Sequence, residues 1–388
     1  MKVAMLTSVG DRCGIAAYTA SLVRALEEFA EVDVVPILVG KQELPHYVEQ
    51  AERLNSADVV HVQHEHSFWG GILPGKSAFW NMRYLIKQPL VVTAHTTTSL
   101  ADLLKVKSEK RLPHLIAKKL LLMRKGYRDS VETAPFITGR TIVHTKAAAL
   151  ELADRGANPA HLHVIPAGIP LPEFPDETGD DFRTKHKLNG KFVVSLFGFI
   201  AVNKGYELLF KSLKRLPENV VAVIAGGPRT PEDGTYVKSL EEAIAELGLK
   251  DRVIITGYLP DRDVAGIMAV SDVVIAPHLY ATGSYSITVP VGYGKAVIAS
   301  DMACFTEMRN LGANISIFHS NDAEALAKSV LLLMDNTQLR KTMEANNHNF
   351  AQSHSWRVAA KATMLVYAES ILDVERLGHH KVVGGHQS

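Results

Sequence analysis

Two segments of this chain have residue types suited to holding an anion. Lys204-Gly205 opens a helical pattern after an apolar run, and a lysine beside the unpaired amides of a helix N-terminus is a suitable counter-charge for a pyrophosphate. The segment 8–16 (SVGDRCGIA) contains Gly14, which lets a ligand approach the backbone closely. The alternative interpretations, a surface lysine and an ordinary turn between a strand and a helix, stay open.

Two further loops combine glycine with polar residues. IAGGP (224–228) runs into a pair that includes Gly226, and Arg229 follows it. The segment 278–301 holds a polar loop in which the backbone amides of residues 283–286 could form a cradle for an anion or a sugar hydroxyl. We therefore expect both loops to line a ligand site.

Histidines gather in two segments of the first half. His95 closes the apolar run 90–94, where a polar residue faces the loop end of a sheet rather than the core, so we favour a functional role for it. The segment 61–71 (HVQHEHSFWGG) could suggest a metal site. However, His61 and His66 should point to opposite faces of a strand, whereas zinc ligands commonly follow tight Cys/His or helical spacings.

The same histidine-rich segment has a second interpretation, which we favour. His64, Glu65 and His66 would be polar residues at a strand end that line the acceptor side of a cleft. Trp69 could then pack under a sugar or acceptor ring. No metal site is expected.

The elements that must position these residues alternate regularly along the chain. Several short β-branched runs are apolar without alternation, as strands buried on both faces are. The expected strands are 3–7, 32–39, 59–63, 90–94, 141–144 and 162–165, then 192–197, 220–225, 253–256, 273–276, 296–299 and 315–318. The expected helices are 15–29, 147–154, 206–213, 237–247 and 323–333. This alternation predicts an α/β protein with two doubly wound, parallel-sheet domains.

A segment rich in proline, glycine and acidic residues, 166–181, separates the two sets of strands. We predict an N-terminal domain over 1–170, joined by a C-terminal helix over about 354–375, and a second domain over 171–353. Residues 376–388 are expected to form a disordered tail. Because ligands of open parallel sheets bind at the carboxyl ends of the strands, a cleft between facing domains should receive the loops described above.

Composition agrees with an ordinary globular protein. Of the 388 residues 47% are hydrophobic, which is enough for two cores, and a formal net charge of +1 argues against a protein built around nucleic acid. Two cysteines, Cys13 and Cys304, cannot form a disulfide framework, and their scarcity fits a cytoplasmic location. The N-terminal apolar run is interpreted as a first strand, and no run approaches the roughly 20 residues that span a bilayer.

Several strings of the sequence, in this order, resemble the family 4 retaining glycosyltransferases of the GT-B fold, in glycosyltransferase group 1. They are CGIAAYT (13–19), HVQHEH (61–66), TAHTTT (93–98), HVIPAGI (163–169), GFIAVNKG (198–205), VIAGG (223–227), YGKAVIASD (293–301) and SHSWRVAAKATMLVY (353–367). The resemblance covers nearly the whole chain. It implies two facing Rossmann-like domains and a tryptophan-containing C-terminal helix that crosses back to the N-terminal domain.

The resemblance also implies roles for individual residues. His95 would lie beside the transferred sugar, and Lys204 would contact the donor pyrophosphate. The donor would also be held by Gly14, Gly198, Asn203, Gly226, Arg229, Tyr258, Thr282, Gly283, Ser284, Tyr285 and Ser286. In this family the leaving diphosphate departs on the face that the acceptor approaches, without a protein nucleophile, and neither a metal nor a cofactor is implied.

The chain departs from the family pattern at three positions. Members usually carry two glutamates where this chain has Ala281 and Val289, and an arginine where it has Phe199. The serine- and glycine-rich loop 282–286 resembles a version of this segment in some branches of the family. Arg229 or Lys295 could supply the missing charge.

The predicted function is transfer of a hexose from a nucleotide-diphosphate sugar to a carbohydrate or lipid-linked acceptor, with retention and without a metal. Two alternatives stay open: a nucleotide-sugar epimerase of the same fold, and a catalytically silent protein that binds a nucleotide sugar. An NAD-dependent enzyme is not expected, because no strand is followed by the three-glycine fingerprint.

A basic segment bears on the location of the protein. Residues 105–128 carry nine Lys/Arg against one acid, interleaved with apolar residues. A helix of this kind could attach to the inner face of an anionic membrane and present the cleft to a lipid-linked acceptor. We favour the alternative, a solvated helix face with its apolar stripe in the core.

Overall fold

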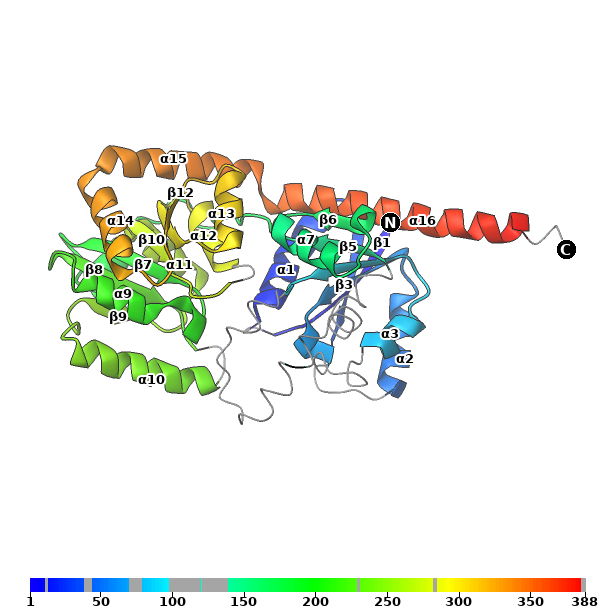
Figure 1. The fold of residues 1–388 in the computed structure, drawn as a ribbon, viewed down its shortest axis with the longest axis horizontal. Helices are drawn as coiled ribbons and strands as arrows, with labels where there is room; N and C mark the ends of the chain where they lie inside the picture. Colours follow the sequence, from blue (N-terminus) through cyan, green and yellow to red (C-terminus); the bar gives the residue numbers. More distant parts are fainter. Residues whose placement is uncertain are drawn as a thin grey trace. The chain divides into compact units, whose positions relative to one another are not determined.

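The computed structural model describes residues 1–10, 13–37, 44–69, 79–97, 120, 139–228, 231–281 and 285–384. The chain forms two compact units, the first of Met1–Ala167 with Trp356–Ser388 and the second of Gly168–Ser355. Each is built on one six-stranded sheet (Figure 1). We call them the N-terminal and the C-terminal unit, and we describe each by itself.

The sheet of the N-terminal unit has the strand order β2-β1-β3-β4-β5-β6, and its pairings are parallel. The order along the sheet reverses between β1 and β3, so a topological switch point lies at their carboxyl ends. The strands are β1 (Lys2–Thr7), β2 (Glu31–Pro36), β3 (Val59–His64), β4 (Leu90–Ala94), β5 (Arg140–Val143) and β6 (Leu162–Val164). The described helices are α1 (Gly14–Leu26), α2 (Leu44–Leu54), α3 (Phe79–Leu85), α7 (Lys146–Asp154) and α16 (Trp356–Gly384), with the short helices η1 (His66–Trp69) and η3 (Pro159–His161).

The sheet of the C-terminal unit has a different order, β12-β11-β10-β7-β8-β9, again with parallel pairings. Here the switch point lies between β7 and β10. The strands are β7 (Phe192–Phe197), β8 (Val220–Ala225), β9 (Val253–Ile255), β10 (Val273–Ala276), β11 (Val297–Ser300) and β12 (Ile315–Phe318). The described helices are α8 (Asp180–Lys185), η4 (Val202–Lys204), α9 (Tyr206–Leu213), α10 (Pro231–Glu246), α11 (Asp261–Val270), α12 (Tyr285–Gly292), α13 (Ala303–Asn310), α14 (Ala323–Asp335) and α15 (Thr337–Ser353).

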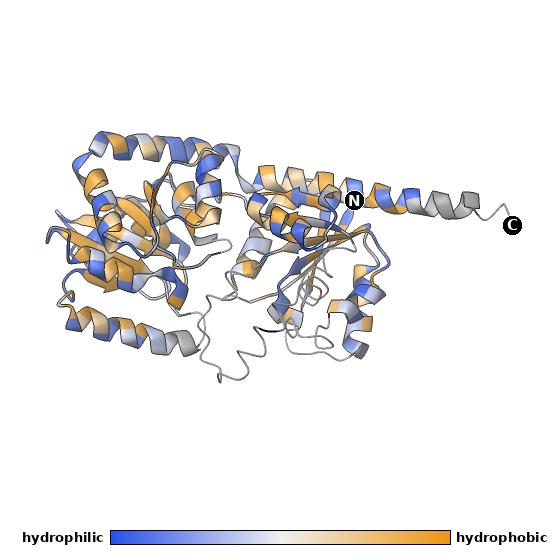
Figure 2. Cartoon of the chain, viewed as in Figure 1, coloured by the Kyte–Doolittle hydropathy of each residue, from blue (hydrophilic) through white to orange (hydrophobic). Residues whose placement is uncertain are grey.

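Burial explains why the central strands lack alternation. All six residues of β3 and all six of β8 are buried, because helices cover both faces of each sheet. In Figure 2 the hydrophobic colour gathers on the strands, while the outer helices are mixed. The predicted fold class and every predicted strand are therefore confirmed, with small shifts at some strand ends.

The sequence analysis did not predict six of the described helices: α2, α3, α8, α11, α13 and α15. The longest of them, α15, is mostly polar, and only Met343, Asn347, Phe350 and Ala351 are buried. Its start is fixed by a cap, since the side chain of Asn336 accepts a hydrogen bond of 2.9 Å from the amide of Leu339. A polar helix with so narrow a buried stripe gives a weak periodic signal.

Helix α16 belongs to the N-terminal unit, as the resemblance implied. Ser370 donates a hydrogen bond of 3.3 Å to the carbonyl of Leu90 in β4. Arg140 of β5 donates to Asp373 at 2.9 Å and to Glu369 at 2.5 Å.

The prediction of a disordered tail from residue 376 is wrong for residues 376–384, because α16 continues to Gly384. The added stretch contains no proline and only Gly378 before its last residue, so nothing local ends the helix earlier. Although α16 has 29 residues, none of the described helices combines the length and the hydropathy needed to cross a membrane. The basic segment 105–128 lies, except for Leu120, outside the described residues.

Candidate functional site

The loop that carries Lys204 is fixed at the switch point of the C-terminal sheet. Lys204 ends η4, which follows β7, and Gly205 then adopts a left-handed conformation with φ of 74°. A Cβ atom on Gly205 would lie 2.0 Å from the carbonyl oxygen of Pro277, directly after β10. Only glycine allows this contact, so the Lys204 loop packs against the end of the strand across the switch point.

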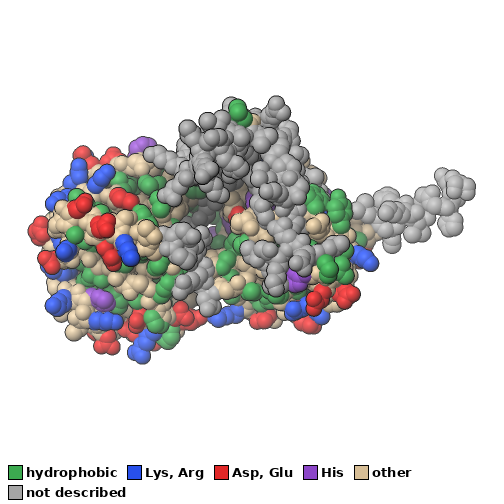
Figure 3. Space-filling model, turned by 90° about the horizontal axis from the view of Figure 1, so that it is seen from below, with side chains coloured by type: hydrophobic (Ala, Val, Ile, Leu, Met, Phe, Trp, Pro, Cys, Tyr) green, Lys and Arg blue, Asp and Glu red, His purple; other side chains and the backbone are tan. Residues whose placement is uncertain are grey.

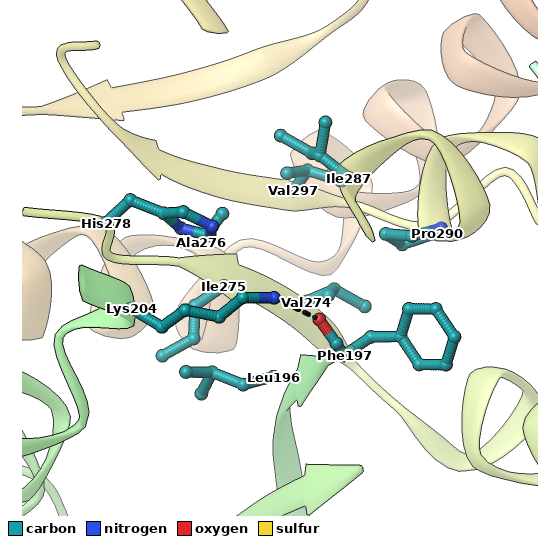
Figure 4. Close-up of a pocket in the computed structure, with 10 residues that line it drawn as sticks. All are labelled: Leu196, Phe197, Lys204, Val274, Ile275, Ala276, His278, Ile287, Pro290 and Val297. Carbon is teal, nitrogen blue, oxygen red and sulfur yellow. Dashed lines mark hydrogen bonds between the residues drawn. The ribbon is translucent and has the colours of Figure 1, made fainter. Parts of the chain in front are cut away.

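The side chain of Lys204 is half-buried, and it lines a small cavity at the end of the strands. Nζ donates to the carbonyl oxygen of Phe197 over 3.4 Å. Figure 4 shows the amine directed toward that carbonyl. The cavity has a volume of about 10 Å³ and is lined also by Leu196, Val274, Ile275, Ala276, His278, Ile287, Pro290 and Val297. Burial lowers the pKa of Lys204 to about 8. Lys204 thus differs from an ordinary surface lysine in its partial burial and in the backbone carbonyl that its amine contacts.

His278 is a second ionisable group at this switch point, and the sequence analysis did not single it out. It follows β10 and is buried, and its carbonyl accepts a hydrogen bond of 2.8 Å from Ser300. Burial, together with the positive charge of Lys204, lowers the pKa of His278 to about 3. Near neutral pH the switch point thus holds one cation beside one neutral imidazole.

The glycine-rich ends of β7 and β8 lie against each other. A Cβ atom on Gly226 would be 2.1 Å from the carbonyl oxygen of Gly198, so both backbones approach more closely than any side chain permits. After β9, the hydroxyl of Tyr258 donates to the carbonyl of Pro228. Phe199, which stands where the family has arginine, contacts the Tyr258 ring edge-on at 6.0 Å.

Asn203 connects the Lys204 loop to the segment after β10. Its side-chain amide donates to the carbonyl of Tyr280 over 2.9 Å, and its own carbonyl accepts from the amide of Leu279 over 2.8 Å. The structure thus brings together five of the predicted donor residues, at one edge of the sheet: Gly198, Asn203, Lys204, Gly226 and Tyr258. Arg229, Thr282, Gly283 and Ser284 lie outside the described residues, as do the side chains of Tyr285 and Ser286.

Ala281 and Val289 stand at the two positions that carry glutamate in the family. Both side chains are apolar, and both contact apolar residues. Ala281 packs against a cluster that contains Cys304 and Phe305, and Val289 packs against one that contains Val193. Lys295 does not replace the missing charge. It precedes β11 and therefore lies at the amino end of the sheet, opposite to Lys204, where Asn347 donates to its carbonyl over 2.8 Å.

Figure 3 shows acidic and basic side chains interspersed over the visible face of the C-terminal unit. This mixture agrees with the net charge of +1. A ligand anion would therefore be attracted by local groups at the switch point rather than by a broad field.

In the N-terminal unit, His95 follows β4 and is held by its neighbour Gln63. Nε2 of His95 lies 2.8 Å from Oε1 of Gln63, and the amide nitrogen of Gln63 lies 3.1 Å from the sulfur of Met5. A thioether can only accept, so the nitrogen of Gln63 must face Met5 and the oxygen must face His95. His95 therefore donates through Nε2, and Nδ1 of the neutral ring is an acceptor.

This contact continues into the core of the unit. Nε2 of His61 lies 3.3 Å from the amide nitrogen of Gln63 and 2.7 Å from the hydroxyl of Thr93, while Nδ1 lies 2.7 Å from the hydroxyl of Tyr367 in α16. Burial lowers the pKa of His61 to about 3, so the ring is neutral. Because Gln63 donates to Nε2, the proton of His61 is on Nδ1 and is donated to Tyr367.

Both nitrogens of His61 are thus occupied by protein partners, which leaves no lone pair for a metal. Across the ranges given above, no three His, Cys, Asp or Glu side chains converge as metal ligands would. The geometry accordingly supports a hydrogen-bonded role for His61.

The ring of Tyr18 in α1 contacts that of His95 and those of two further aromatic residues. Its ring lies 4.8 Å from His95, 5.0 Å from His144 and 4.9 Å from Trp356. His144 follows β5, and its Nδ1 donates to the carbonyl of Ile165 over 2.9 Å. Burial lowers the pKa of His144, and burial with the nearby rings of His144 and His61 holds the pKa of His95 well below its usual range.

Sequence reasoning missed Gln63, His144, Tyr18 and Tyr367. His144 carried the same signal as His95, a histidine directly after an apolar strand. Tyr18 and Tyr367 lay inside strings of the family resemblance, but only the fold brings them to the histidines.

Two of the residues predicted on the acceptor side are buried, which corrects the prediction for them. His64 and Trp69 are each 1% exposed, and their rings contact Phe79 at 5.2 and 5.5 Å. The reason is η1, which turns the chain back after β3 and carries Trp69 into the core. Trp69 therefore does not pack under a ligand ring.

The other two acceptor-side residues remain partly accessible. Glu65 accepts a hydrogen bond from the hydroxyl of Thr96, and the ring of His66 contacts that of His64 at 4.9 Å. Burial lowers the pKa of His66 to about 4, with a smaller contribution from Arg155. Both residues follow the carboxyl end of β3, next to His95 in the sheet order.

Gly14 is the first residue of α1, and a Cβ atom on it would meet nothing within 4 Å. An open hollow of about 580 Å³ runs along one face of α1, from Gly10 and Cys13 before the helix to Arg24 and Glu27 at its other end, and Gly14 is not among the residues that line it. The absence of a side chain at Gly14 is thus not required by packing among the described residues. The empty space around Gly14 permits a close approach by a ligand.

Comparison with known sequences supports the resemblance. The model of the family described as "Glycosyl transferases group 1" matches residues 178–350, and that described as "Glycosyltransferase Family 4" matches residues 41–172. Together they cover more than half of the chain. Mannosylfructose-phosphate synthase of Agrobacterium fabrum is 32% identical over 137 residues, which are 33% of this chain and 30% of that protein.

Two further relatives extend the comparison. D-inositol 3-phosphate glycosyltransferase of Xylanimonas cellulosilytica is 24% identical over 222 residues, 55% of this chain and 53% of that protein. The matches thus span about half or less of the length of these curated relatives. The crystal structure of Anabaena Alr3699/HepE with UDP-glucose superposes with a TM-score of 0.75 at 18% identity, over 96% of this chain and 100% of that one.

That superposition shows the fold, and the two family matches show the relationship. Both units have the parallel sheets that the GT-B fold requires, and α16 belongs to the N-terminal unit. The chain belongs to the group 1 glycosyltransferases of the GT-B fold, with a family 4-like N-terminal region.

Proposed function

We propose that this protein transfers a hexosyl group from a nucleoside-diphosphate sugar to a carbohydrate or lipid-linked acceptor. The observation that carries the proposal is Lys204, a half-buried cation beside the glycine-rich ends of β7 and β8. Open parallel sheets bind ligands at such a switch point. The Lys204 ammonium would pair with the diphosphate, whose negative charge grows as the bond to the sugar breaks.

The N-terminal unit contributes His95 to this proposal. With Nε2 committed to Gln63, the ring offers Nδ1 as an acceptor for a sugar hydroxyl. A neutral histidine in this role stabilises the sugar without adding positive charge next to an oxocarbenium-like carbon. The reaction would proceed with retention, as the resemblance implies, and with Lys204 rather than a metal ion as the counter-charge.

The relatives support the choice of substrates. Their names describe a mannosylfructose-phosphate synthase and a D-inositol 3-phosphate glycosyltransferase, and the superposed structure holds UDP-glucose. We therefore propose a hexose as the transferred group and a hydroxylated carbohydrate or its lipid-linked form as the acceptor.

The test is a transfer assay that follows release of the nucleoside diphosphate from a panel of nucleotide sugars. It is run with mono- and disaccharide phosphates and lipid-linked sugars, with and without EDTA. Transfer with retained anomeric configuration, read by NMR of the product and unchanged by EDTA, supports the proposal. Inverted product contradicts retention, and activity lost in EDTA contradicts the role of Lys204 as sole counter-charge.

A catalytically silent protein that binds a nucleotide sugar is the second candidate. The observation that favours it is the apolar packing of Ala281 and Val289, at the positions that carry the two glutamates in the family. This candidate predicts a nucleotide-dependent rise in melting temperature without release of diphosphate from any donor.

A further inference from the structure

The outer face of α16 carries a regular apolar stripe. Val358, Leu365 and Leu372 are 47%, 67% and 47% exposed, although the opposite face of the helix is buried against the N-terminal unit. Figure 2 shows hydrophobic residues along α16 among hydrophilic ones. The three side chains are seven residues apart, which places them on one line along an α-helix.

Single exposed leucines are ordinary on protein surfaces, but this spacing is not that of scattered residues. A seven-residue repeat is the spacing with which two helices pack along a shared seam. Ala362 and Ala368 lie on the same side of the helix, and their small side chains permit a close approach of a second backbone.

The residues of this face are arranged symmetrically about Leu365. Val358 and Leu372 lie seven residues before and after it, Lys361 and Glu369 four, and Ala362 and Ala368 three. A helix with this arrangement matches a copy of itself that runs in the opposite direction. That is the property of an isologous two-fold interface, in which each residue meets its symmetric counterpart.

The charges select the direction of pairing. Lys361 and Glu369 are both on the exposed side of α16, and Glu369 is 47% exposed, although its carboxylate also binds Arg140 of its own chain. In an antiparallel pair, Lys361 meets the partner's Glu369 twice. A parallel pair would place each of them opposite its own copy, which repels.

We propose that α16 pairs antiparallel with α16 of a second copy of this chain, about a two-fold axis that passes beside Leu365. The stripe from Val358 to Leu372 is about 21 Å long, at a rise of about 1.5 Å per residue. An interface of this length is small, so the dimer forms and dissociates with concentration.

The first test is analytical ultracentrifugation of the whole chain over a wide range of concentrations. The wild-type protein is expected to change from monomer to dimer as concentration rises. Leu365→Glu places two carboxylates beside the axis and should leave a monomer at every concentration. Leu332→Glu is the matched control, because Leu332 is 53% exposed on α14 and outside the stripe.

A wild-type chain that stays monomeric throughout overturns the proposal, as does a dimer that persists in Leu365→Glu. Circular dichroism melting of both variants shows that each is folded, since both positions are exposed on helices.

The charge pairing is tested by mixing. Lys361→Glu alone and Glu369→Lys alone each create two repulsive pairs in a homodimer, so each should dimerise more weakly than the wild type. Glu369→Lys also removes the ion pair with Arg140, so circular dichroism melting first shows that this variant is folded. A mixture of the two variants restores both attractive pairs and should form a mixed dimer. If mixing gives no more dimer than either variant alone, the antiparallel register is wrong.

Direction is tested by cross-linking with a short bismaleimide. Val358→Cys mixed with Leu372→Cys should give a covalent mixed dimer, whereas each variant alone should give only the background seen with the wild type and its own Cys13 and Cys304. Efficient linking of Val358→Cys to itself would show a parallel pair and contradict the proposal.

Discussion

Gln63 fixes the imidazole of His95 by a single hydrogen bond of 2.8 Å, and the orientation of that bond is set by the sulfur of Met5. The amide of Gln63 has one oxygen and one nitrogen, and the thioether of Met5, which can only accept, requires the nitrogen. The oxygen therefore faces His95. A chain of buried contacts thus determines which nitrogen of a residue in the proposed site is available to substrate.

Gln63→Leu should lower kcat about tenfold and leave the KM of the donor within a factor of about two, since a buried hydrogen bond contributes about 1.4 kcal/mol. The variant also leaves Nε2 of His95 without its acceptor. Steady-state kinetics with saturating acceptor measure the change. Gln88→Leu is the control. Gln88 lies just before β4, at the end of that strand opposite to His95, and its side chain donates a hydrogen bond to the carbonyl of Asn55. Equal kcat values for the two variants would remove Gln63 from the account.

Gly205→Ala should destabilise the protein by about 3 kcal/mol or more, because the new methyl group would collide with Pro277 while φ stays at 74°. Gly190 is the matched control. It has a φ of 69° but open space around it, so Gly190→Ala carries only the conformational cost of about 1 kcal/mol. Urea unfolding measures both. Equal losses would mean that the contact with Pro277 does not constrain the Lys204 loop.

Gly14→Ala should leave the melting temperature unchanged or slightly raised, since alanine favours a helix and nothing lies within 4 Å of the added methyl group. Nucleotide binding should nevertheless weaken, if a phosphate approaches this backbone as the resemblance implies. Gly234→Ala in α10 is also free of contacts and should change neither property apart from a small gain in stability. Undiminished nucleotide affinity in Gly14→Ala would place the phosphate elsewhere.

Donor binding should weaken as pH rises through about 8. Burial lowers the pKa of Lys204 to about 8, and a bound diphosphate favours the charged amine, so the complex holds this proton to a higher pH than the free protein does. Affinity is then constant below pH 8 and falls up to about tenfold per unit above it. Calorimetry from pH 7 to 10 measures the slope. Lys204→Ala should lose it, and a slope that persists in that variant would assign the proton to another group.

The fold could be predicted from the sequence because its central strands are buried on both faces. Such strands are continuous apolar runs, which differ clearly from the amphipathic pattern of the helices. β8 and β10 were predicted with their observed ends. Helix α15 was missed because few of its residues face the core. The end of α16 was misjudged because nothing local marks it.

The site was readable only in part. The polar residues after strands, His95 and Lys204, are local signals, and the structure places both at the carboxyl edges of their sheets. The contact of His61 with Tyr367 joins residues 306 apart in the sequence, which no local pattern reveals. The prediction that Trp69 packs under a ligand ring was wrong for a related reason. An aromatic residue after a strand is equally typical of a binding surface and of a core.

Binding of nucleoside diphosphates by the wild type, Lys204→Ala and Lys211→Ala tests the central claim most directly. Lys211 is an exposed lysine of α9, the helix that follows Lys204, and serves as the matched control. The account predicts that at least one nucleoside diphosphate raises the melting temperature of the wild type and of Lys211→Ala, with EDTA present, and that Lys204→Ala loses most of this shift. No shift with any nucleotide, or an undiminished shift in Lys204→Ala, would contradict it.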